Sequence, residues 1–119
     1  MSTFPRIAVR TVRGRNTNRF GGGFDERSIN AVWNRATIVP GVNPNVQRKD
    51  ACGAWIQRSL YGSTVEVGMG WEIDHIIPVS RNGSDDMSNL QPLQWQNNRE
   101  KSDQFPITPR QYSAVVARN

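Results

Sequence analysis

The stretch of sequence that decides the fold runs from residue 70 to residue 104. Its informative segments are Glu72-Ile73-Asp74-His75-Ile76-Ile77-Pro78, Asn82-Gly83-Ser84-Asp85-Asp86, Ser88-Asn89-Leu90-Gln91-Pro92-Leu93 and Asn97-Asn98-Arg99-Glu100-Lys101-Ser102-Asp103. Alternating side chains over residues 71–77 predict a strand that Pro78 ends, and turn-forming residues then predict a surface loop. A second short strand over 91–95 and a helix over 97–102 follow. The predicted order is strand, long loop, strand, helix.

The remainder of the chain predicts one α+β domain with an added N-terminal helix and a basic arm. With 119 residues the chain has the length of a single domain. Asp25 is a candidate N-cap, and the apolar residues that follow at helical spacing predict a helix over 26–36. Residues 1–23 hold five arginines and no acid, so we expect a flexible basic arm there and a single domain over 24–119.

The charge of the chain is basic, and arginine supplies most of it. The formal net charge is +5, with 13 arginines and two lysines. Because the planar guanidinium pairs well with phosphate oxygens, a polyanion such as nucleic acid is the natural partner. A basic surface that serves only solubility would give the same composition. No run of about 18 apolar residues and no signal-peptide pattern is visible, so we expect no membrane partner.

Cys52 is the only cysteine and His75 the only histidine. An intramolecular disulfide and a zinc ribbon built from four cysteine or histidine ligands are therefore excluded. Cys52 stands among small and apolar neighbours, which favours a buried side chain over a nucleophile. A single cysteine, which cannot form an intramolecular disulfide, fits a protein of the reducing cytoplasm.

Asp74, His75 and Asn98 carry the groups that phosphodiester hydrolysis requires. An imidazole accepts a proton from water near neutral pH, while carboxylate and amide oxygens suit a hard divalent cation. Adjacent strand residues point to opposite faces, so the strand must bend or end for Asp74 and His75 to share one site. From the residues alone, a structural Asp-His pair and a metal site both remain open.

The four quoted segments resemble the motif of the HNH endonucleases, over about a quarter of the chain. This resemblance implies a ββα-metal core over about residues 70–104. It implies that His75 is the general base and that Asp74 and Asn98 are the metal ligands, so that Asn98 belongs to both the catalytic and the metal site. Asn89 matches the middle asparagine, which in this family braces the loop and orients the histidine.

The resemblance also implies the cofactor and the nucleic-acid contacts. Many relatives carry paired cysteines for a structural zinc, but Gln94 and Asn97 stand at one such pair, so we expect no structural zinc. We expect Mg²⁺ or Mn²⁺ at the active site, with other transition metals as alternatives. The residues expected to contact nucleic acid are Arg99 and Lys101 on the helix and Arg13, Arg15 and Arg19 in the arm.

The expected activity is metal-dependent hydrolysis of double-stranded DNA, with one strand nicked by each active site. Two alternatives stay open: a nucleic-acid-binding module that keeps the fold without turnover, and an effector or toxin nuclease. RNA as a substrate and the oligomeric state, monomer or homodimer, stay open as well. No element predicts base readout, so we expect weak sequence preference.

Overall fold

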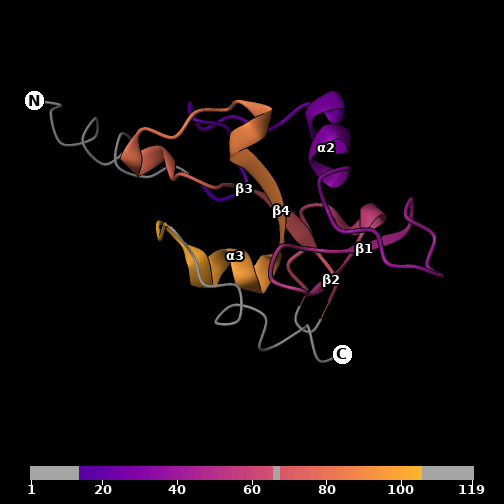
Figure 1. The fold of residues 1–119 in the computed structure, drawn as a ribbon. Helices are drawn as coiled ribbons and strands as arrows, with labels where there is room; N and C mark the ends of the chain where they lie inside the picture. Colours follow the sequence, from indigo (N-terminus) through magenta and orange to yellow (C-terminus); the bar gives the residue numbers. More distant parts are fainter. Residues whose placement is uncertain (1–13, 66–67, 106–119) are drawn as a thin grey trace, which may run out of the picture.

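The computed structural model describes residues 14–65 and 68–105. Helices and strands are both present, which confirms the α+β class (Figure 1). The elements of this part of the chain are, in order, α2 (Glu26–Trp33), β1 (Gln47–Lys49), β2 (Trp55–Gln57), the 3₁₀ turn η1 (Arg58–Leu60), β3 (Trp71–His75), the 3₁₀ turns η2 (Val79–Arg81) and η3 (Met87–Asn89), β4 (Leu90–Gln94) and α3 (Trp95–Lys101).

The strand, loop, strand and helix predicted from the sequence are β3, the segment 76–89, β4 and α3. The two strands are antiparallel, and their register pairs Trp71 with Gln94 and His75 with Leu90. Trp95 was expected to end the second strand, but it begins α3. The reason is a local cap: the Gln94 side chain accepts hydrogen bonds from the backbone N–H groups of Gln96 and Asn97, so the helix begins two residues before the predicted start.

The β3–β4 pair lies between α2 and α3 (Figure 1). Trp71 and Ile73 pack into the hydrophobic core with Val32 and Trp33 of α2. The alternate residues of β3, Glu72 and Asp74, face α3, where they contact Asn98 and Lys101. Because strand side chains alternate between faces, one strand carries both the apolar core and the polar site.

Helix α2 begins at Asp25, whose carboxylate accepts a 2.8 Å hydrogen bond from the Ser28 N–H. It ends at Trp33, three residues before the predicted end, with Asn34 as its C-cap. Its apolar face is buried, in keeping with a core role. No helix in residues 14–65 and 68–105 is long and apolar enough to cross a membrane.

A hairpin of β1 and β2 is joined to the end of β4 through Asp50, which is 2% exposed. One carboxylate oxygen of Asp50 accepts from the Cys52 and Ala54 N–H groups. The other accepts from the Gln94 N–H at 2.9 Å and from the Asn97 amide at 3.1 Å. Thus hydrogen bonds to one carboxylate join the hairpin to the β4–α3 junction.

Candidate active site

A pocket of about 400 Å³ brings together the three residues predicted for catalysis and metal binding, Asp74, His75 and Asn98. The first two are the last residues of β3, and Asn98 comes from α3. Because β3 ends at His75, the two adjacent side chains line the same pocket despite their opposite strand orientations. The complete lining consists of Gly14, Arg15, Asn16, Ile73, Asp74, His75, Pro78, Asn98, Ser102 and Asp103.

Asp74 is buried, and both of its carboxylate oxygens accept hydrogen bonds. The Lys101 ammonium lies 3.1 Å from Oδ1, and the Gln91 amide nitrogen lies 2.9 Å from Oδ2. Burial raises the pKa of Asp74, and the nearby charge of Lys101 opposes that rise. The carboxylate is therefore held in position by two donors before any ligand arrives.

Lys101 occupies a different position from the one expected of a phosphate-contacting residue. Its side chain is 1% exposed, and its ammonium bonds to Asp74 and, at 3.0 Å, to the backbone oxygen of His75. The helix turns Lys101 toward β3, where the acidic face of the strand attracts the cation. Arg99 is exposed instead, with its guanidinium 4.5 Å from the centre of the Trp95 ring.

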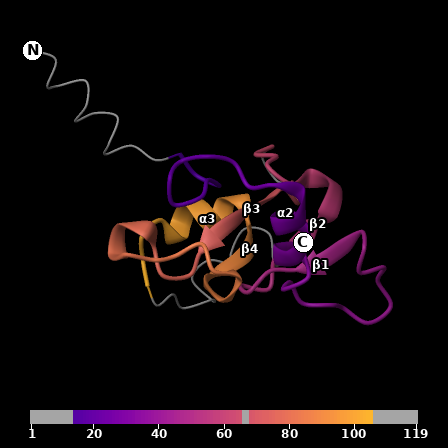
Figure 2. The same ribbon diagram turned by 90° about the horizontal axis from the view of Figure 1, so that it is seen from above.

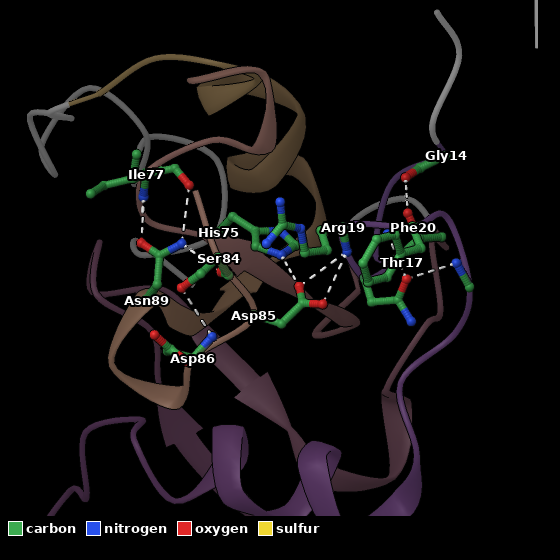
Figure 3. Close-up of polar contacts among 12 residues, drawn as sticks. Gly14, Thr17, Arg19, Phe20, His75, Ile77, Ser84, Asp85, Asp86 and Asn89 are labelled. Carbon is green, nitrogen blue, oxygen red and sulfur yellow. Dashed lines mark hydrogen bonds and ion pairs between the residues drawn. The ribbon is translucent and has the colours of Figure 1, made fainter. Parts of the chain in front are cut away.

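His75 is 3% exposed, and its Nε2 lies 2.7 Å from the carboxylate of Asp85 (Figure 3). The same carboxylate accepts from the backbone N–H of Arg19, at 3.0 and 3.3 Å from its two oxygens. The ring of Phe24 is tilted beside the imidazole, with centroids 6.2 Å apart. Asp85 was not among the predicted site residues, because the sequence marked it only as one of several turn-formers. The sequence feature that could have indicated Asp85 is an acidic residue in the loop that follows the only histidine of the chain.

Asn89 joins the two ends of the loop between the strands (Figure 3). Its amide oxygen accepts from the Ile77 N–H, and its amide nitrogen donates to the carbonyl oxygens of Ile77 and Ser84. Its backbone oxygen accepts from the Ile76 N–H. These bonds fix the chain just after His75, which is the geometry that a loop-bracing residue requires.

The side-chain amide of Asn98 is oriented by Glu72, a residue of β3. The Asn98 amide nitrogen donates a 2.9 Å hydrogen bond to the Glu72 carboxylate. Since a carboxylate accepts and the amide nitrogen donates, this bond determines which end of the amide faces Glu72. The amide oxygen of Asn98 is therefore the end left for another partner.

Asp74 and Asn98 fit a hard divalent cation by the chemistry of their donors. Mg²⁺ prefers oxygen ligands and binds proteins through one or two carboxylates, with water and phosphate oxygens completing its shell. Within residues 14–65 and 68–105, no three His, Cys, Asp or Glu side chains form a group that could hold a metal ion. The donor set thus suits a cation that takes most of its ligands from water and substrate.

The segment of residues 14–23 passes beside α3 and β3 before it reaches α2 (Figure 2). The Asn16 side-chain oxygen accepts from the Ile73 N–H at 2.8 Å and from the Tyr61 hydroxyl at 2.9 Å. This part of the expected flexible arm is thus bonded to the strand and forms one wall of the pocket, with Arg15 in the lining. Residues 1–13 of the arm, with Arg13, lie outside the described residues.

Residues 66–107 match the sequence model of a family described as HNH endonuclease. The matched range contains β3, β4 and α3, and with them Asp74, His75, Asn89 and Asn98. The chain is therefore a small protein with an HNH-family segment, and the match indicates nuclease activity in general terms. Neither a curated protein nor a solved structure matches the chain significantly.

Proposed function

We propose that the protein is a metal-dependent DNA endonuclease with its active site in the pocket at the end of β3. The observation that carries the proposal is the convergence of Asp74, His75 and Asn98 on this pocket from two separate elements. Residues 70–104 form the ββα-metal core of a single domain over 24–119. Residues 1–23 form a basic segment that adds contacts to DNA.

Each residue of the pocket has a role that its chemistry suits. His75 accepts the proton of the attacking water. Asp74 and Asn98 hold the divalent cation, and Asn89 keeps the loop after His75 in place. A bound Mg²⁺ or Mn²⁺ would neutralise charge on the phosphate and stabilise the leaving oxygen.

The basic residues at the pocket and around it suit the phosphate backbone. Arg15 lines the pocket, and Arg19 and Arg99 are exposed; Arg13 belongs to the same basic segment. If about five arginines meet phosphates, the slope of log affinity against log salt is about −4 to −5. One active site cuts one strand, so a monomer nicks DNA.

The test is a supercoiled-plasmid assay with EDTA, Mg²⁺ or Mn²⁺. Wild type is expected to give open circles with Mg²⁺ or Mn²⁺ and nothing with EDTA, and His75→Ala is expected to lower the rate about 100-fold or more. Asp74→Asn should also remove cleavage, whereas Asp86→Asn, at an exposed acid outside the pocket, should not.

Three results would oppose parts of the proposal. Cleavage that persists in His75→Ala would remove the histidine from its role. DNA binding without cleavage in any metal would favour a binding module with this fold. Linear product that appears before open circles would contradict nicking by a monomer.

A further inference from the structure

Asp85 connects the histidine of the pocket to the N-terminal segment. Its Oδ1 lies 2.7 Å from His75 Nε2, and both of its oxygens accept from the Arg19 backbone N–H (Figure 3). The three residues come from β3, from the loop between the strands and from the segment before α2. The Arg19 group that donates in this contact is its backbone N–H.

The contact determines which imidazole nitrogen carries hydrogen. Both oxygens of the Asp85 carboxylate already accept from the Arg19 N–H. Toward His75 the carboxylate therefore acts as a hydrogen-bond acceptor and not as a donor. At 2.7 Å, Nε2 must therefore donate, and the neutral imidazole carries its hydrogen on Nε2. The lone pair that is free to take a proton is then on Nδ1.

We propose that Asp85 is a positioning residue, which fixes His75 in the Nε2–H form and makes Nδ1 the nitrogen that accepts the proton from water. This inference rests on the proposed nuclease function. In the hydrolytic step the water oxygen bonds to phosphorus, its proton moves to Nδ1, and the bond from phosphorus to the leaving oxygen breaks. The leaving oxygen takes a proton from solvent. The Asp85 carboxylate stabilises the imidazolium that forms.

The loop is built so that Asp85 faces His75 before substrate binds. Asn89 joins Ile77 and Ser84 through its side chain, which closes the loop on both sides of Asp85. Gly83 lies so close to the Ile77 carbonyl that a Cβ there would overlap it, so only glycine fits. The Arg19 N–H also bonds to the carboxylate, at 3.0 and 3.3 Å from its two oxygens. A preset acceptor of this kind lets the histidine keep one orientation during the reaction.

His75 is the only histidine in the chain, so a histidine-labelled sample has one imidazole to observe. In wild type, ¹⁵N NMR at neutral pH is expected to show hydrogen on Nε2, with an N–H signal that the bond to Asp85 protects from exchange with water. Asp85→Ala is expected to lose that signal. Asp86→Asn, which changes the neighbouring exposed acid, is expected to keep it. Hydrogen on Nδ1 in wild type, or a signal unchanged in Asp85→Ala, would overturn the proposal.

Cleavage kinetics give the second readout. Asp85→Ala should lower kcat about 10- to 100-fold, less than the loss of the base itself, with KM for DNA changed by no more than about threefold. Asp85→Asn keeps an acceptor without the charge, so its kcat should fall between wild type and Asp85→Ala. This variant also serves if Asp85→Ala fails to fold. A loss that appears in KM alone would mean that Asp85 acts on DNA binding and would overturn the positioning role.

The two readouts separate this inference from the proposed function. If wild type does not cut DNA but its imidazole signal depends on Asp85, the nuclease function is wrong and the assignment of the nitrogens stands. If wild type cuts DNA and neither the signal nor kcat responds to Asp85, the nuclease function stands and Asp85 has no role in it.

Discussion

Lys101 and Asp74 form an ion pair inside the protein, with 3.1 Å between Nζ and Oδ1. Both side chains are buried, and the ammonium also donates to the backbone oxygen of His75. A buried carboxylate without a cation would be costly, since burial alone raises its pKa. The Lys101 ammonium is therefore a cation of the chain itself that pairs with Asp74, the proposed metal ligand.

Lys101→Met keeps most of the length of the side chain and removes its charge. We expect the free energy of unfolding to fall by about 3–5 kcal/mol at neutral pH, because Asp74 is left buried without its partner. Urea denaturation of both proteins measures the change. Arg99→Met, at an exposed cation of the same helix, is the control and should change stability by about 1 kcal/mol or less. Equal losses in the two variants would contradict a special role for the pair.

Divalent cations should partly restore the stability of Lys101→Met if Asp74 holds the metal. A ligand that binds the folded state raises the melting temperature, and it does so more when a competing cation has been removed. We therefore expect Mg²⁺ or Mn²⁺ to raise the Tm of Lys101→Met more than that of wild type, measured without DNA. A Tm in Lys101→Met that does not respond to either metal would place the cation elsewhere.

Asp50→Asn should weaken the junction between the β1–β2 hairpin and α3. The Asp50 carboxylate accepts four N–H donors, two at each oxygen. An asparagine can serve only two of them, and its amide nitrogen would face the other two donors. We expect a loss of about 1–3 kcal/mol for each donor left without an acceptor, measured by urea denaturation. Asp86→Asn, at an exposed acid, should stay within about 0.5 kcal/mol of wild type.

The local pattern of the sequence predicted most of the β3–β4–α3 unit. Alternation marked β3, and the turn-formers after Pro78 marked the loop. The pattern failed at the start of α3, because a glutamine is an unusual cap and Trp95 suits a strand as well as a helix. The β1–β2 hairpin was not assigned, since its strands have only three residues each, which is too few to establish a period from the sequence.

The contacts around the site could not be predicted from the sequence, because their members are far apart in the chain. Asp85 and Arg19 are hydrogen-bonded although they are 66 positions apart in the sequence. Asp50 and Asn97 are hydrogen-bonded at a separation of 47 positions. Lys101 was expected to contact nucleic acid from the surface of the helix, and only its packing against β3 shows that it is buried. The motif indicated Asp74, His75 and Asn98 as residues of the pocket. Only the tertiary fold shows that Arg15 and Asn16 of the N-terminal segment line the same pocket.

Cys52 should resist thiol reagents in the folded protein. Its side chain is buried, and burial raises the pKa of the thiol to about 12, with the charges of Asp50 and Asp74 adding to the rise. At pH 8 only about one thiol in ten thousand is then the reactive thiolate. The neutral thiol favours the folded state below its ordinary pKa of 9.0, and this contribution is lost as the pH rises toward 12. Reaction with a disulfide reagent at pH 8 should therefore be slow in buffer and fast in urea; equal rates would contradict the burial.

Glu72 should control how well Asn98 serves as a metal ligand. Its carboxylate accepts the Asn98 amide nitrogen at 2.9 Å, which leaves the amide oxygen for a cation. Glu72→Ala removes the acceptor, so the amide can turn, and we expect the affinity for Mn²⁺ to fall about 10- to 100-fold. Glu72→Gln keeps an acceptor oxygen and should lose less than about threefold. Calorimetric titration with Mn²⁺ in the absence of DNA measures both variants, independently of cleavage. Equal affinities in wild type and Glu72→Ala would show that Glu72 does not orient Asn98, and a Glu72→Gln loss as large as that of Glu72→Ala would show that its charge, rather than its hydrogen bond, acts on the cation.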